Sequence, residues 1–429
     1  MTYRQRLYYF IVIIIVFLIA APLVILYATG WRFNFQTMQI QKVGGLIIKT
    51  EPHGALVNLN GKSLTKKTPL TANNLRPDEY TILVSKEGYY NWTRKVEIEP
   101  GESWRFDSIY LLKNSPPLQN LDLNNISFAT FSPTGGKIAA LQNQHIFIID
   151  TPTATVQHDL RQNQRGFTLE WSPDESYITV KNDDGSCLAL NMNEPEKIID
   201  LTKEYDLAIT NCKWSPVDNS VLYVTTPNGL YRLNIFQHTK TLITDKTDIW
   251  PANDDLFIFP EASQLNFAKS DFKLINQINL PEINNLQFYN CAENYVCIVN
   301  TLQKKMYIYN VKNNNYNEFS AEVTGISFIK NREKIIVYNE HEIWTLNLAN
   351  GEKKFVTRTS DTINSASWLK SQNYIIYGQN NSGLTILEET EFSQNIYELA
   401  ATDINHLAAS NTGDYAMIIT AGQLKIIPF

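Results

Sequence analysis

The residue types that most often carry catalysis or bind metals are few in this chain and lie far apart. Its 429 residues include six histidines and four cysteines, and no pair of cysteines has the CxxC spacing of a zinc site. The nucleophile motif GxSxG, the metal motif HExxH, the phosphate-binding loop and GxGxxG are all missing. The sequence therefore predicts no enzyme, no metal site and no cofactor.

Two acidic pairs come nearest to a cation site. Asp183 and Asp184 precede Gly185 between two short apolar runs, but the glutamate that completes a calcium-binding loop is missing. Asp254 and Asp255 stand before another such run. We interpret the first pair as a hairpin turn, and the similar placement favours a turn for the second.

Cys291 and Cys297 flank a predicted hairpin turn, so their side chains can meet across two paired strands. A disulfide between them is one interpretation, and buried free thiols are the other. No pairing is assigned to Cys187 and Cys212.

The best candidates for contact with a glycan or a protein partner are the aromatic residues Tyr89, Tyr90 and Trp92. Aromatic faces stack on flat partners such as sugar rings. The alternative is that these rings pack inside their own domain or against a neighbouring one.

The balance of charge argues against nucleic acid as a partner. Lysine and arginine number 37 against 43 aspartates and glutamates, and the net charge is −6. Because binding to phosphates needs a basic surface, we predict no nucleic-acid partner.

The N-terminal segment is uniformly apolar. No charged residue lies between Arg6 and Arg32, and a helix of this length exceeds the roughly 30 Å hydrocarbon core of a bilayer. We predict a cytoplasmic tail over residues 1–6, a transmembrane helix in the lipid bilayer over 7–30 and a juxtamembrane linker over 31–43. A cleaved signal peptide is the competing interpretation, although its apolar region is normally shorter.

Arg4 and Arg6 determine the predicted orientation. The segment just after the helix has fewer lysines and arginines per residue than the segment before it. The cytoplasmic flank of a membrane helix normally carries more lysines and arginines than the opposite flank. The N-terminus is therefore predicted in the cytoplasm, with the bulk of the chain outside the cytoplasmic membrane.

Residues 44–113 are predicted to form a small β-sandwich of short strands separated by Gly, Pro and Asn turns. It contains turn-forming, small and aromatic residues in a set order: Pro52, Gly54, Ala55, Gly61, Pro69, Gly88 and Tyr89. This order resembles the PEGA domain, an envelope-associated β-sandwich, with His53 in place of the motif's glutamate. The resemblance implies a location at the cell envelope. We interpret these residues as structural, because glycines supply backbone freedom and prolines fix turns.

After residue 114, short apolar runs recur about every 40 residues, and a second run follows each. The runs include Ile138, Ile178, Leu222, Phe257, Val296, Ile335, Ile375 and Ala416. Four strands per repeat are typical of a β-propeller blade, so residues 114–429 are predicted to form an eight-bladed propeller, with seven blades as the alternative. The last repeat lacks a fourth strand, and a strand over 117–123 is expected to complete it and close the ring.

Three repeats open with an aromatic residue followed by Ser-Pro: Phe131-Ser132-Pro133, Trp171-Ser172-Pro173 and Trp214-Ser215-Pro216. These openings resemble the WD40-like or TolB-type propeller repeats of bacterial envelope proteins. The predicted fold class of the whole chain is all-β with one N-terminal transmembrane helix.

The predicted function is that of a membrane-anchored, extracytoplasmic binding or scaffold protein. Its propeller would present an interaction surface to an envelope protein or glycan, without catalysis. The rival hypothesis is an extracellular hydrolase or lyase with its active site in the propeller channel, which predicts ionisable residues with perturbed pKa values there. A sensor of the envelope is disfavoured, because the predicted cytoplasmic tail is very short.

Overall fold

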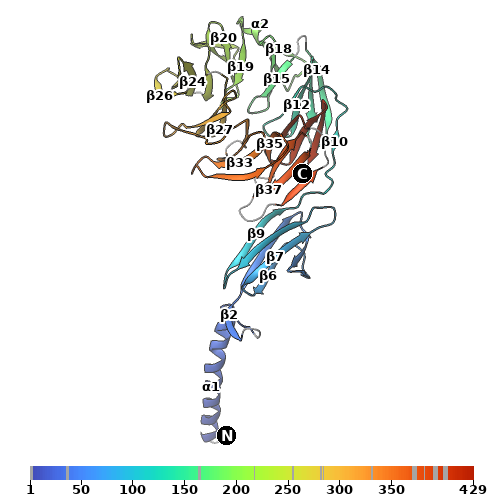
Figure 1. Cartoon of the computed structure of the whole chain (residues 1–429), viewed down its shortest axis with the longest axis vertical. Helices are drawn as coiled ribbons and strands as arrows, with labels where there is room; N and C mark the ends of the chain where they lie inside the picture. Colours follow the sequence, from blue (N-terminus) through green and yellow to red (C-terminus); the bar gives the residue numbers. More distant parts are fainter. Residues whose placement is uncertain are drawn as a thin grey trace. The chain divides into compact units, whose positions relative to one another are not determined.

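The structure, a computed structural model, describes residues 3–34, 38–162, 166–216, 218–253, 256–280, 283, 285–329, 332–369, 374–380, 382–389, 395–399 and 404–429. These residues belong to two compact units (Figure 1). Unit 1 is formed by residues 1–115 with 390–395, and unit 2 by residues 116–389 with 396–429. Asp254 and Asp255, for which a turn was predicted, lie outside the described residues.

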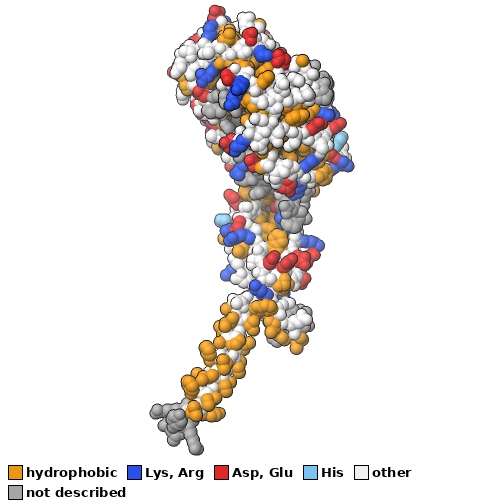
Figure 2. All heavy atoms as spheres, turned by 90° about the vertical axis from the view of Figure 1, so that its left-hand side faces the viewer, with side chains coloured by type: hydrophobic (Ala, Val, Ile, Leu, Met, Phe, Trp, Pro, Cys, Tyr) orange, Lys and Arg blue, Asp and Glu red, His pale blue; other side chains and the backbone are white. Residues whose placement is uncertain are grey.

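The helix α1 (Tyr3–Ala28) begins unit 1. Its segment Leu7–Ala28 is apolar and unburied, so its length and composition would allow it to cross a membrane. Figure 2 shows hydrophobic side chains along this helix. It ends before the predicted residue 30, where Gly30 takes a left-handed conformation with φ of 87°. The predicted linker contains a hairpin in which β1 (Trp31–Asn34) pairs with β2 (Gln39–Lys42).

The rest of unit 1 is a sandwich of two sheets. The first sheet has the order β6 (Leu70–Leu75), β3 (Gly44–Glu51), β9 (Ser103–Tyr110), and the second has the order β5 (Lys62–Ser63), β4 (Leu56–Leu59), β7 (Asp78–Ser85), β8 (Trp92–Ile98). Buried and exposed residues alternate along β8, as expected for a strand with one face in a core. Trp92 and Ile98 of β8 share that core with Leu46 and Ile48 of β3.

Unit 2 contains eight four-stranded sheets among its described residues, here called sheets 1 to 8. Sheet 1 consists of β11 (Phe128–Phe131), β12 (Lys137–Gln142), β13 (His145–Asp150) and β14 (Thr155–Arg161), and sheet 2 of β15 (Gly166–Trp171), β16 (Tyr177–Asn182), β17 (Cys187–Asn191) and β18 (Ile198–Asp200). Sheet 3 consists of β19 (Asn211–Trp214), β20 (Val221–Thr226), β21 (Gly229–Asn234) and β22 (Thr239–Thr244), and sheet 4 of β23 (Trp250–Asn253), β24 (Leu256–Glu261), β25 (Gln264–Ala268) and β26 (Leu274–Asn279).

Sheets 5 to 8 follow in the same way. Sheet 5 consists of β27 (Leu286–Ala292), β28 (Tyr295–Asn300), β29 (Lys305–Asn310) and β30 (Asn315–Glu318), and sheet 6 of β31 (Gly325–Ser327), β32 (Lys334–Tyr338), β33 (Glu342–Asn347) and β34 (Lys353–Arg358). Sheet 7 consists of β35 (Ile363–Leu369), β36 (Tyr374–Gln379), β37 (Gly383–Glu388) and β38 (Ile396–Leu399), and sheet 8 of β39 (His406–Ala409), β40 (Tyr415–Thr420), β41 (Gln423–Pro428) and β10 (Gln119–Asn120). A short helix, α2 (Leu201–Tyr205), connects sheets 2 and 3.

The order of strands in sheet 8 closes the ring. Its fourth strand, β10, precedes sheet 1 in the chain and pairs antiparallel with β41, the last strand of the chain. Sheets 8 and 1 also share an apolar core in which Met417 and Ile419 join Ile138 and Ala140. The first strands of several neighbouring sheets contact one another, so these strands lie innermost around the propeller axis.

The Ser-Pro turns are structural. Ser132, Ser172 and Ser215 are buried, and the Oγ of each accepts a hydrogen bond from a backbone N–H of its own turn. For Ser172 the donor is the N–H of Tyr177, at 2.9 Å. Burial of an unpaired N–H is costly, so the serine hydroxyl stabilises the first hairpin of its sheet.

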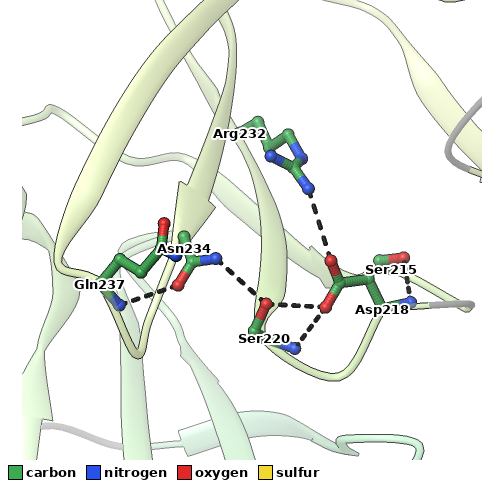
Figure 3. Close-up of polar contacts among 6 residues, drawn as sticks. All are labelled: Ser215, Asp218, Ser220, Arg232, Asn234 and Gln237. Atoms are coloured by element: carbon green, nitrogen blue, oxygen red, sulfur yellow. Dashed lines mark hydrogen bonds and ion pairs between the residues drawn. The ribbon is translucent and has the colours of Figure 1, made fainter.

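Figure 3 shows the turn that follows Ser215. Asp218 Oδ1 accepts hydrogen bonds from the N–H and the hydroxyl of Ser220, at 2.9 and 2.7 Å. Asp218 Oδ2 lies 3.5 Å from the guanidinium of Arg232 on β21, and Asn234 Nδ2 donates to Ser220 Oγ at 3.1 Å. These contacts join the first turn of sheet 3 to its third strand.

Two disulfides lie in unit 2. Cys291 and Cys297 are joined between β27 and β28 of sheet 5. Cys187 of β17 and Cys212 of β19 are also joined, so this second bond links sheet 2 to sheet 3. The sequence did not indicate this second pair, because its cysteines belong to different repeats.

Candidate binding site on the inner strands of the propeller

A cavity of about 320 Å³ lies at the inner strands of sheets 2 to 4. It is lined by Thr168, Glu170, Thr179, Lys181, Asn211, Cys212, Lys213 and Trp250. These residues come from β15, β16, β19 and β23, so the propeller repeat itself brings three successive sheets to one polar cavity. We call it the inner pocket.

Three charged side chains line the inner pocket. Glu170 accepts a hydrogen bond from the backbone N–H of Trp214 and is attracted by the ammonium of Lys213. The Nζ of Lys213 lies 3.9 Å from the ring centroid of Trp250, within range of a cation–π interaction. The Nζ of Lys181 donates a hydrogen bond to Asn211 Oδ1 at 3.1 Å.

Burial changes the titration of the central pair. It raises the pKa of Glu170 to about 7, although the nearby Lys213 and the Trp214 N–H act in the opposite direction. Burial likewise lowers the pKa of Lys213 to about 8, against the attraction of Glu170. Removal from water penalises both charged forms. Two groups that exchange protons near neutral pH therefore lie side by side in the inner pocket.

The repeat explains how these two side chains reach the pocket. Trp171 and Trp214 are buried in apolar clusters of their sheets, and the residue before each tryptophan lines the pocket. That residue is Glu170 in sheet 2 and Lys213 in sheet 3. Sequence reasoning missed both residues. The available signal was the presence of opposite charges at one motif position in successive repeats.

Trp250 is held by contacts within the protein. Besides Lys213, it contacts Phe288 of β27, with ring centroids 5.2 Å apart and planes 25° from parallel. Trp250 therefore positions the Lys213 ammonium. The polar atoms available to a ligand are those of Glu170, the two lysines and the neighbouring hydroxyls and amide.

The aromatic cluster predicted from the sequence does not form one exposed surface. Trp92 is completely buried, and its ring meets that of Phe106 edge-on with centroids 5.3 Å apart. Its interpretation as a contact residue is therefore wrong, because β8 turns this position into the core of the sandwich. Tyr89 and Tyr90 are half-buried, and their contact with a partner stays a prediction.

The motif residues of the small sandwich occupy turns and core positions. Gly54, Gly61 and Gly88 all have positive φ values, and Ala55 is completely buried. Pro52 and Pro69 each follow a cis peptide bond. Within the described part of the chain, no three His, Cys, Asp or Glu side chains gather in a way that could hold a metal ion.

Comparison with known proteins supports both parts of the fold. The model of the PEGA domain matches residues 43–109, within unit 1. The crystal structure of the C-terminal WD40 domain of Sif2 is similar with a TM-score of 0.53 and 14% identity, covering 73% of this chain and 99% of that one. Unit 2 is therefore a β-propeller.

Two further structures have lower scores. The β-propeller domain of Cps50 (Swd1) from Myceliophteria thermophila matches with 11% identity and a TM-score of 0.47, covering 72% of this chain and 98% of that one. The structure of U3-55K matches with 10% identity and a TM-score of 0.47, covering 73% and 100%. No curated protein matches the chain in sequence.

Proposed function

We propose that this chain is a membrane-anchored, extracytoplasmic binding protein of the bacterial cell envelope, and that its propeller holds an envelope protein or glycan at the inner pocket. The anchor is α1, with the N-terminus in the cytoplasm. The proposal gives the PEGA domain the role of a spacer next to the membrane, and it assigns the chain no catalysis.

The location rests on three observations. The apolar segment Leu7–Ala28 is long enough for a bilayer and leaves its side chains outside the protein core. The density of Arg4 and Arg6 before it favours a cytoplasmic N-terminus. The match of residues 43–109 to the PEGA domain supports an extracytoplasmic position for the chain beyond the helix.

The observation that carries the binding role is the charged composition of the inner pocket. In other repeats the residue before the Phe or Trp is uncharged, namely Thr130, Gln287, Ser327 and Ser367. Buried charges cost stability, so their presence at only two successive repeats favours a functional reason. With Glu170 ionised and both lysines protonated, the pocket has one positive charge in excess. A partner that offers an anionic group would balance it.

Capture by the full-length protein in detergent tests this role. Wild type is expected to retain an envelope component that the variants Lys213→Met and Lys181→Met lose. Lys203→Met is the matched control, because Lys203 is exposed on α2 and pairs with Asp200 at 3.0 Å. Equal retention by wild type and by all three variants would contradict the assignment of the inner pocket as the binding site.

An extracellular lyase is the second candidate, and the pKa values in the inner pocket favour it. A carboxyl with a pKa of about 7 beside an ammonium with a pKa of about 8 is suited to proton transfer at neutral pH. A hydrolase with two catalytic carboxyl groups is less well supported, since Glu170 is the one carboxyl group among the described residues that line the pocket. Turnover of an envelope polysaccharide that Glu170→Gln abolishes would establish catalysis.

A further inference from the structure

A second cavity, of about 590 Å³, lies between sheets 5 and 6. It is bounded by β28, β29 and β30 on one side, and by β33, the turn after it and the beginning of β34 on the other. We call it the outer groove. Its polar lining is dominated by six asparagines: Asn310, Asn313, Asn315, Asn317, Asn347 and Asn350. It shares no lining residue with the inner pocket among the described residues.

We propose that the outer groove binds a neutral oligosaccharide. A carboxamide has N–H donors and an oxygen acceptor but no net charge. A sugar hydroxyl can therefore donate a hydrogen bond to the amide oxygen or accept one from the amide N–H. A volume of this size lies in the range of ligand pockets that hold small molecules or short oligomers. The inference goes beyond the proposed function, because it concerns a different site and a different ligand.

The turns of the groove fix the direction of two amide groups. Asn310 Oδ1 accepts hydrogen bonds from the N–H groups of Lys312 and Asn313, at 2.9 and 3.1 Å. Asn347 Oδ1 accepts one from the N–H of Ala349, at 2.9 Å. Within the described part of the chain neither Nδ2 group has an acceptor, so both remain available as donors to a ligand. Preorganised donors lower the entropic cost of binding.

The floor of the groove is apolar. Phe319, Leu346 and Leu348 are buried members of the core cluster between sheets 5 and 6, and they also line the groove. Sugar rings have apolar C–H faces as well as hydroxyl edges. Burying those faces on this floor adds hydrophobic stabilisation to the hydrogen bonds from the amide rim.

The two charged side chains that line the groove, Glu318 and Lys353, have opposite signs, which favours a neutral ligand. Glu318 pairs with Lys305, at 2.9 Å between Oε1 and Nζ. Lys353 Nζ lies 4.3 Å from the ring centroid of Phe319 and donates to Ser320 Oγ at 3.1 Å. One carboxylate and one ammonium therefore line the groove. Because their charges are opposite, the groove has no net charge that would select an acidic or basic ligand.

Calorimetry with the full-length protein in nanodiscs tests the proposal. The probes are hexasaccharides of glucose, mannose and N-acetylglucosamine, a hexasaccharide of glucuronic acid, and an uncharged peptide of similar length. At least one neutral hexasaccharide is expected to bind. The substitution pair Asn310→Asp and Asn347→Asp keeps the oxygen that each turn needs and removes the amide donors, so binding should weaken about tenfold or more.

Asn339→Asp is the matched control. Asn339 Oδ1 accepts from the N–H groups of His341 and Glu342 in another turn of sheet 6, outside the groove. This control should leave saccharide binding unchanged.

Failure of all three neutral saccharides to bind folded protein would overturn the proposal. So would tighter binding of the acidic hexasaccharide or of the peptide that the groove substitutions weaken, or neutral-saccharide binding that these substitutions leave intact. The groove variants leave the inner pocket unchanged. Loss of saccharide binding by these variants is therefore distinguishable from failure of the proposed function.

Discussion

Replacing both charges of the inner pocket, with Glu170→Gln and Lys213→Met, is expected to stabilise the propeller near pH 7.5. The pair lies in the pocket with Thr168, Thr179 and Trp250, and both side chains are half-buried. Neutral side chains of similar size avoid the cost of desolvating two charges, which the attraction between them repays only in part. Such a gain would mark the pair as retained for function rather than for stability.

The pKa values give the size and the sign of the effect. Folding moves the pKa of Glu170 from 4.5 to about 7, which corresponds to ~3 kcal/mol. Between those pH values the folded state binds more protons than the unfolded state, so the free energy of unfolding falls as pH rises. The pKa of Lys213 falls from 10.5 to about 8, so the unfolded state binds more protons between pH 8 and 10.5 and the free energy of unfolding rises there.

The contribution of the pair to stability should therefore be lowest between about pH 7 and 8. The two shifts belong to one coupled pair and are not added. We expect the double variant to exceed wild type by about 1–3 kcal/mol at pH 7.5, with the difference shrinking towards pH 5 and towards pH 10.

Chemical denaturation of wild type and double variant from pH 5 to 10 measures this difference, and comparing the two proteins cancels the titration of all other groups. Glu170→Gln alone should be less stable than the double variant at pH 7.5, because it leaves the Lys213 ammonium without its partner. A wild type that is more stable than the double variant at pH 7.5, or a difference that does not change with pH, would refute the reasoning.

Three further predictions concern single features of the fold. Trp92→Ala should lower the free energy of unfolding of unit 1 by about 3–5 kcal/mol in denaturant titrations, because the ring is completely buried, whereas Tyr90→Ala should cost less. Ser172→Ala should lower the stability of unit 2 by about 1–3 kcal/mol in the same assay, because the N–H of Tyr177 loses its buried acceptor. Cys187→Ala with Cys212→Ala should cost about 2–4 kcal/mol, and a reductant should then destabilise this variant less than wild type, since a bond between sheets 2 and 3 is already gone.

The fold was predictable because its signals are local and repeated. Apolar runs about every 40 residues predicted four-stranded units, and the structure has eight such sheets in unit 2 among the described residues. The incomplete last repeat predicted a closing strand over 117–123, and β10 at Gln119–Asn120 lies in that segment. The hairpin of β1 and β2 was missed, since the segment is short and its alternation is weak.

The site was harder to predict, because it depends on which residues of different repeats face the same space. Glu170 and Lys213 are 43 positions apart, and only their equivalent places before Trp171 and Trp214 relate them. The disulfide between Cys187 and Cys212 was missed for the same reason. For Trp92 the residue type suggested a contact surface, whereas the alternation along β8 decides its burial.

Photo-crosslinking in intact cells tests the central claim most directly. A photoreactive residue in place of Thr168, inside the inner pocket, is compared with one in place of Thr239, which is exposed on β22. The account predicts a specific crosslink to an extracytoplasmic component from position 168 alone, and its loss when Lys213→Met is added. Equal crosslinking from both positions, or none from position 168 in a folded and membrane-inserted protein, would contradict it.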